Sequence, residues 1–208
     1  MGLASRFLLI QDLEPESPDS TVNGFAMASI ALVLVVAVAD NDVIGRGGRL
    51  PWRLKSDMQR FRTLTWGQPV IVGRKTYLSF TRQPLPGRTN IVVSRDPNFA
   101  VAGALVTPSL AAAFEVARGD ALRRGVDTIV VLGGADIYAQ TIARADRMIV
   151  TRVHLKPDGD TKFPAIDPGV WKEVQRTEHG AGTDDEANYA VHVYERRAAD
   201  ASVAGAGL

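Results

Sequence analysis

Short apolar runs rich in valine and isoleucine recur along the chain, and helical patterns separate most of them. The runs lie at 30–39, 69–73, 89–94, 127–133 and 147–153. The helical patterns lie at 55–65, 74–80, 109–118 and 134–143. A strand without polar positions is buried on both faces, and strands that alternate with helices pair in parallel. The sequence therefore predicts an α/β fold with a mostly parallel, doubly wound sheet.

The C-terminal part shows a different pattern. Residues 171–179 and 188–197 alternate apolar and polar side chains on either side of a polar turn, which is typical of an antiparallel hairpin. With this hairpin added at one edge, we expect a mixed sheet of about eight strands flanked by four helices.

The first apolar run allows a second interpretation. Residues 25–39 are uncharged and end in an A-x-A pattern, as a signal peptide does at its cleavage site. The segment before them carries Glu14, Glu16 and Asp19 against Arg6 alone, whereas a signal peptide begins with basic residues. A buried central strand is therefore the favoured interpretation.

The chain of 208 residues is long enough for one domain with its own core. We expect residues 27–197 to form that domain. Residues 1–26 are expected to be a disordered extension, and the small, featureless residues of 198–208 a disordered tail.

Charge and cysteine content narrow the class of protein. The formal net charge is +1, so nothing points to nucleic acid or to a membrane surface as a partner. The absence of cysteine excludes disulfides and thiolate zinc sites and suits a reducing compartment, so a cytoplasmic protein is expected. The three histidines (His154, His179 and His192) lack metal-ligand spacing, and no metal is expected.

Three junctions between a strand and the segment after it could bind a phosphate. In open α/β sheets, ligands lie at the carboxyl ends of strands, and anions bind at helix N-termini. The junctions hold Gly73, Arg74, Lys75 and Thr76 in "VIVGRKTY", Ser94 and Arg95 in "VVSRD", and Gly133 and Gly134 in "VVLGGADIY". Each alone has an ordinary structural explanation, as a tight turn or a solvated cation. Their coincidence makes a dinucleotide phosphate site as plausible as that explanation. No G-x-G-x-x-G follows a strand, which argues against an ordinary Rossmann fold.

The stretch "VIGRGGRLPWRLKSDMQRF" (43–61) combines a glycine-rich loop with an apolar lip at Leu50, Pro51 and Trp52, as a mobile lid requires. Asp57 follows at the start of a helix. From the residues alone, a solvated carboxylate at a helix N-terminus is the more common explanation, and a functional group is the alternative.

These motifs together, with "PLPGRTNIVVSR" and "GDTKFP", give residues 30–197 a resemblance to the bacterial chromosomal type of dihydrofolate reductase. The resemblance implies reduction of 7,8-dihydrofolate to 5,6,7,8-tetrahydrofolate for one-carbon metabolism. It implies NADPH as cofactor, hydride transfer to pterin C6 and protonation at N5. Dihydrofolate and NADPH would be the partners of a monomeric protein, with no nucleic acid and no membrane involved.

The resemblance also implies residue roles. Asp57 would bind the pterin, Thr151 would hydrogen-bond Asp57, and Arg88 would pair with the glutamate α-carboxylate. The apolar walls would be Val35, Val36, Leu50, Phe61 and Leu132. Water admitted past Leu50 would protonate N5, and Trp52 would help hold an ordered water near Asp57, which places both with Asp57 and Thr151 in the catalytic set. The residues matched to the cofactor site are Ala37, Ile44, Gly45, Gly73, Arg74, Lys75, Thr76, Ser94, Arg95, Gly133, Gly134, Ala135, Asp136, Ile137 and Tyr138.

Two alternatives remain beside this interpretation. The pyrimidine reductase of riboflavin synthesis shares the fold and the cofactor, but it would not need Asp57 and Arg88 together. A non-catalytic NADP-binding module would not need the set of Asp57, Phe61, Arg88 and Thr151. The lid departs from the family pattern in one respect, because Leu50 stands where other members have methionine.

Overall fold

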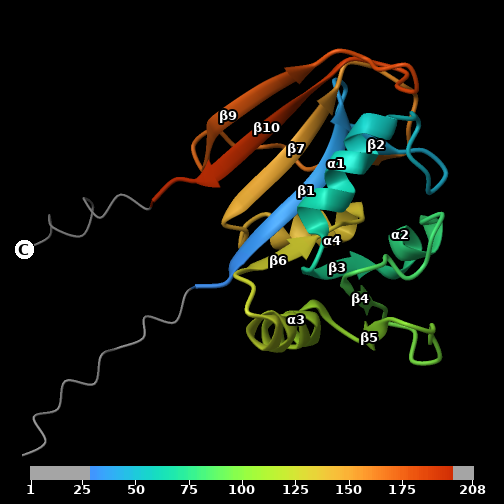
Figure 1. Ribbon diagram of the computed structural model, residues 1–208, viewed down its shortest axis with the longest axis vertical. Helices are drawn as coiled ribbons and strands as arrows, with labels where there is room; N and C mark the ends of the chain where they lie inside the picture. The colour runs from blue at the N-terminus through green and yellow to red at the C-terminus, as the bar shows by residue number, and fades with distance from the viewer. Residues whose placement is uncertain (1–28, 199–208) are drawn as a thin grey trace, which may run out of the picture.

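The computed structural model describes residues 29–198 (Figure 1). Its main sheet is built from β1 (Ala31–Ala39), β3 (Pro69–Gly73), β4 (Thr89–Val93), β5 (Leu105–Thr107), β6 (Thr128–Val131), β7 (Arg147–Val153), β9 (Trp171–His179) and β10 (Tyr189–Arg196). The strand order is β5-β4-β3-β6-β1-β7-β10-β9, with parallel pairing from β5 to β7 and antiparallel pairing from β7 to β9. A separate two-stranded ribbon joins β2 (Val43–Gly45) to β8 (Thr161–Lys162). The helices are α1 (Lys55–Thr65), α2 (Arg74–Ser79), α3 (Leu110–Arg124) and α4 (Ala135–Thr141).

Strand β1 lies at the centre of the sheet and separates two layers of core. Successive side chains of a strand point to opposite faces. Leu34 and Val36 pack with side chains of α3 and α4, whereas Val33 and Val35 pack with side chains of α1 and α2. Two helices therefore cover each face, which confirms the doubly wound arrangement predicted from the continuous apolar runs.

The C-terminal hairpin forms one edge of the sheet. Figure 1 shows β10 beside β7 with β9 outside it. A third cluster packs Trp52 and Leu54 against Tyr189 and Val191 of β10. This cluster joins the segment before α1 to β10, the last strand of the domain.

Most of the predicted elements are confirmed, including the strand interpretation of residues 31–39. The predictions for residues 1–26, and for 198–208 apart from residue 198, lie outside the described residues. No described helix has the length and apolar character needed to span a membrane. Three short strands, β2, β5 and β8, were not predicted.

Helix α3 is longer than the prediction of 109–118. It continues to Arg124 and ends at Gly125, whose φ of 66° is the left-handed conformation that favours glycine. Asp120 interrupts the apolar pattern, but it is buried and pairs with Arg123 and Arg124 one turn along. The helix therefore continues through a position that the apolar periodicity marks as its end.

Candidate active site

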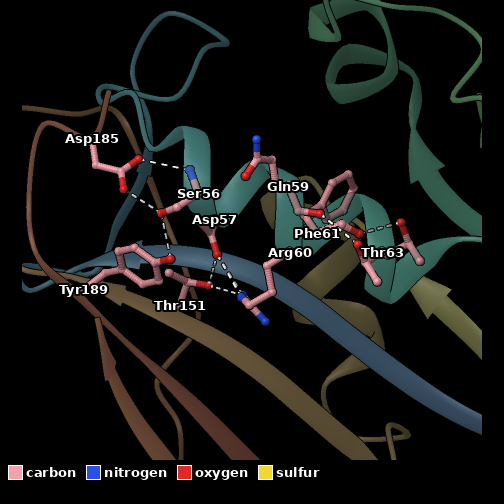
Figure 2. A network of polar contacts seen from close by, with 10 residues as sticks. Ser56, Asp57, Gln59, Arg60, Phe61, Thr63, Thr151, Asp185 and Tyr189 are labelled. Carbon is pink, nitrogen blue, oxygen red and sulfur yellow. Dashed lines mark hydrogen bonds and ion pairs between the residues drawn. The ribbon is translucent and has the colours of Figure 1, made fainter. Parts of the chain in front are cut away.

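Asp57 is held against the sheet by two side chains (Figure 2). Its Oδ1 accepts a hydrogen bond from Thr151 Oγ1 at 2.8 Å and one from Arg60 Nη2 at 2.7 Å. Arg60 Nη2 also donates to Thr151 Oγ1 at 2.5 Å, so the three groups form a closed triangle. The Asp57 side chain is 14% exposed, and Thr151 on β7 is buried. Asp57 is therefore not a solvated carboxylate at a helix end.

The position of α1 depends on residues far along the chain. Leu54 is the N-cap residue and its side chain makes no cap hydrogen bond. Asp185 accepts the backbone N–H of Ser56 at 3.0 Å and the Ser56 hydroxyl at 2.5 Å, and that hydroxyl lies 2.8 Å from the hydroxyl of Tyr189. The hydrogen bonds from Ser56 lower the pKa of Asp185 below its ordinary value. This distant carboxylate supplies the cap that the local sequence lacks and fixes the turn that carries Asp57.

The predicted apolar walls lie on two faces of the sheet. Val35, Leu132 and Phe61 belong to one cluster, on the side of α1. Val36 packs in the cluster on the opposite face, together with Tyr138. The Tyr138 hydroxyl is buried and donates to the carbonyl oxygen of Val35 at 2.7 Å, and burial raises the pKa of Tyr138. Its proton is thus held in a hydrogen bond to the central strand.

Arg88 is a buried guanidinium with neutral hydrogen-bond partners. It is 8% exposed, and it donates to the carbonyl oxygen of Pro86 and to the Thr65 hydroxyl, both at 2.9 Å. Its charged group also lies 5.9 Å from the ring centre of Phe61. Burial, with a smaller contribution from nearby Arg62, lowers the pKa of Arg88. Within residues 29–198 no carboxylate forms an ion pair with it.

The predicted lid contacts the "GDT" segment. Asp160 Oδ2 accepts the backbone N–H of Gly47 at 2.8 Å, and the N–H of Asp160 donates to the carbonyl oxygen of Gly45 at 3.1 Å. The hydrogen bond from Gly47 is the largest cause of a lowered pKa at Asp160. Leu50 is half exposed at 48%, whereas Trp52 is buried in the third cluster. Two hydrogen bonds therefore join the glycine-rich loop to the segment around Asp160.

Three glycines meet where β3 and β6 end. The N–H of Gly73 donates to the carbonyl oxygen of Gly133 at 2.7 Å, and the Gly133–Gly134 peptide bond is cis. A Cβ at Gly133 would lie 2.6 Å from the Tyr138 ring, and one at Gly134 would lie 2.7 Å from Thr76 Oγ1. No other residue type fits at Gly133 or Gly134 without a shift of its neighbours.

The predicted cations follow the ends of β3 and β4. Arg74 forms an ion pair with Asp96 at 2.6 Å and lies over the Phe99 ring. Lys75 and Arg95 are exposed, whereas Ser94 is buried and its hydroxyl accepts the N–H of Asp96 at 3.2 Å. Of the other predicted cofactor residues, Ile44 and Ile137 pack in the cluster of Tyr138, Ala37 packs against the third cluster, and Ala135 and Asp136 form the first turn of α4.

The family model for dihydrofolate reductase matches residues 31–196. The chain belongs to the dihydrofolate reductase family. Dihydrofolate reductase HdrB of Haloferax volcanii is 39% identical over 182 residues, which cover 86% of this chain and 90% of that protein. Dihydrofolate reductase of Neisseria meningitidis serogroup A is 41% identical over 163 residues, covering 78% and 97%. A structure of Enterococcus faecalis dihydrofolate reductase complexed with NADP(H) and RAB-propyl has a TM-score of 0.72 at 28% identity, covering 81% and 97%.

As a dihydrofolate reductase, the chain is an oxidoreductase that reduces dihydrofolate with NADPH. The match to this family leaves no support for the pyrimidine reductase or for the non-catalytic module. In the described part of the chain, no group of three or more histidine, aspartate or glutamate side chains could hold a metal ion.

Sequence reasoning missed four residues of this dihydrofolate reductase site: Arg60, Asp96, Asp185 and Tyr189. For Arg60 a signal existed, because residues three apart on a helix are neighbours and Arg60 follows Asp57 at that spacing. Asp185 and Tyr189 come from a loop and a strand more than a hundred residues beyond α1, and no local pattern connects them to it.

Proposed function

We propose that Asp57 is the group that binds and orients the pterin ring of dihydrofolate. An ionised carboxylate only accepts hydrogen bonds, and the pterin edge presents two N–H donors from its 2-amino group and adjacent ring nitrogen. The observation that supports this assignment is the hydrogen bond from Thr151 to Asp57 Oδ1. Phe61, one turn beyond Asp57 on α1, packs against the apolar cluster that contains Val35 and Leu132.

Arg88 is assigned to the α-carboxylate of the glutamate tail. A guanidinium can bind a carboxylate through two parallel N–H bonds. Arg88 is buried with neutral partners only, and a charge removed from water gains most from an opposite charge. The contact of Arg88 with Phe61 supports this role, because it links the tail site to the apolar wall of the ring site.

The three glycines, Gly73, Gly133 and Gly134, are assigned to the binding of NADPH. A Cβ at Gly133 or Gly134 would clash with Tyr138 or Thr76, so only glycine allows the backbone to pass this close to the start of α2 and α4, where a phosphate would bind. Arg74, Lys75, Thr76, Ser94 and Arg95 would hold the phosphates, and the cations would favour the 2′-phosphate of NADPH over NADH. When bound, NADPH supplies the hydride.

The remaining catalytic roles concern water. Asp57 orients the pterin and polarises it, while the proton reaches N5 from water admitted past Leu50. Leu50 is half exposed at the rim, which suits a movable apolar barrier, and buried Trp52 suits a fixed wall for ordered water near Asp57. The lid, held through Asp160 and Gly47, excludes bulk water from the site.

The test is the loss of absorbance at 340 nm with purified protein, dihydrofolate and either NADPH or NADH. We expect turnover that requires dihydrofolate and strongly prefers NADPH. Asp57→Asn should lower turnover by orders of magnitude at pH 7.5, and Arg88→Gln should mainly raise the KM for dihydrofolate. Normal turnover of Asp57→Asn at that pH would overturn the assignment of Asp57.

We further infer that residues 27–197 are one autonomous domain, and that the protein is a cytoplasmic monomer. The family match over 31–196 supports the bounds of the domain, and the absence of cysteine suits a reducing compartment. Light scattering coupled to size exclusion should return about the mass of one chain, 22.4 kDa. A mass of twice that value would refute the monomer.

A further inference from the structure

We propose that Arg60 is a specificity-determining residue, which makes the polar end of the substrate pocket select neutral rings over cationic ones. The inference rests on the proposed role of Asp57. The pterin of dihydrofolate is uncharged when it binds, whereas a 2,4-diaminopyrimidine binds a carboxylate as a ring cation. A lone Asp57 would favour the cation, and an Asp57 already paired with Arg60 would not.

The contact between Arg60 and Asp57 is unlike an ordinary surface pair. The Arg60 side chain is 26% exposed and that of Asp57 is 14% exposed, whereas in the comparable pair of α3 the Arg123 side chain is 70% exposed. Arg60 also binds a second element, since its Nη2 donates to Thr151 on β7 as well as to Asp57. Exposed pairs are weak because water screens them and because the side chains are mobile. The contact of Arg60 with buried Thr151 reduces both the screening by water and the mobility of the side chain.

The hydrogen bonds of Arg60 go to the same carboxylate oxygen that a bound ring would use. Asp57 Oδ1 accepts from Thr151 Oγ1, from Arg60 Nη2 and, at 3.2 Å, from Arg60 Nε. A ring that offers two N–H donors to the carboxylate therefore shares Oδ1 with the guanidinium. Figure 2 shows Arg60 and Thr151 converging on the same side of Asp57.

The charges then decide which ligand is favoured. Asp57 and Arg60 together sum to zero, so a neutral ring leaves the site neutral and a cationic ring leaves it with one positive charge. Two cations a few ångströms apart in a partly buried site repel each other enough to change an affinity by about tenfold. Arg60 therefore lowers affinity for a cationic ring and has little electrostatic effect on a neutral one.

The test compares two ligands in four proteins. Dissociation constants are measured at pH 7 by quenching of tryptophan fluorescence, with trimethoprim as the diaminopyrimidine and folic acid as the neutral ring. The variants are Arg60→Gln, which removes the charge and keeps a donor, Arg60→Lys, which keeps the charge, and Arg118→Gln. Arg118 is exposed on α3 and serves as the control for net charge.

Arg60→Gln should bind trimethoprim about tenfold more tightly and folic acid within about threefold of the parent. Arg60→Lys and Arg118→Gln should keep the parent ratio of the two constants. A purely structural role for Arg60 would move both ligands together, so an unchanged ratio in Arg60→Gln would overturn the proposal. An equal change of ratio in Arg118→Gln would do the same.

A further variant separates this inference from the proposed function. If Asp57→Asn binds both ligands as the parent does, the role of Asp57 itself is wrong. If Asp57→Asn loses affinity for both while Arg60→Gln keeps the parent ratio, Asp57 retains its role and only the role of Arg60 is refuted.

Discussion

Thr151→Val is the substitution that most directly tests how Asp57 is held. Valine has nearly the shape of threonine, so it leaves no cavity at this buried position on β7. It removes the hydroxyl that donates to Asp57 and accepts from Arg60. The variant therefore changes the orientation of the carboxylate without removing its charge.

The magnitude follows from the bonds that are lost. A hydrogen bond to a charged group contributes about 1.5–3 kcal/mol, and 1.4 kcal/mol corresponds to tenfold in a rate or binding constant. Arg60 still holds Oδ1 in the variant, which places the loss at the lower end of this range. We expect kcat/KM for dihydrofolate to fall about tenfold to thirtyfold.

The assay is steady-state oxidation of NADPH at 340 nm, with Thr151→Ser as the matched control. Serine keeps the hydroxyl and loses the methyl group, so it should remain within about threefold of the parent. The melting temperature of both variants shows whether the fold survives. The reasoning fails if Thr151→Val retains the parent kcat/KM, or if Thr151→Ser falls as far as Thr151→Val.

Three further predictions concern other parts of the site. Asp57→Asn should lose most of its hydride-transfer rate near neutral pH and less of it at acidic pH, and a flat ratio to the parent in single-turnover pH profiles would contradict this. Asp160→Ala should slow turnover while the Kd for dihydrofolate stays close to the parent value, because the N–H of Gly47 loses its acceptor. The pKa of Asp160 is lowered in the folded protein, so the hydrogen bond to Gly47 contributes its full stabilisation above the ordinary pKa of aspartate. That stabilisation is lost as the pH falls through the lowered pKa, and amide hydrogen exchange at Gly47 would measure the loss. Gly133→Ala should lower both the melting temperature and the affinity for NADPH, because its Cβ would lie 2.6 Å from the Tyr138 ring and the residue has a φ of 95°. If the melting temperature and the affinity both stay at the parent values, the packing argument is wrong.

Much of this fold follows from local patterns. The strands at 69–73 and 147–153 match their predicted bounds. Each contains a short run rich in β-branched residues, which has few alternatives to a strand. Strands β2 and β8 are only a few residues long and alternate too little to be seen, and their pairing depends on a lid contact between distant segments. Helix α3 extends beyond its predicted end at residue 118, because Arg123 and Arg124 form ion pairs with the buried Asp120.

The candidate site, too, could be predicted from the sequence only in part. Asp57, Thr151 and the glycines of the cofactor site could be named from motifs, and the structure brings Asp57 and Thr151 into contact. Adjacent residues of a strand point to opposite faces, so Val35 and Val36 could not both line one face, but which of the two lies on the side of α1 depends on tertiary packing. Likewise Asp185 acts on Ser56 only because the C-terminal segment returns to α1.

That return of the C-terminal segment has a consequence for synthesis of the protein. The cap on α1 comes from Asp185, and Thr151 lies on β7, which pairs with β10 along its whole length. A nascent chain that has emerged only as far as α4 therefore contains Asp57 but none of the partners from β7 onward that orient it. Contacts of such high sequence separation form late and slow the folding of a domain. Bound substrate should accordingly protect the domain as one cooperative unit against proteolysis, and a ribosome-stalled fragment ending before Tyr189 should gain no protection from it.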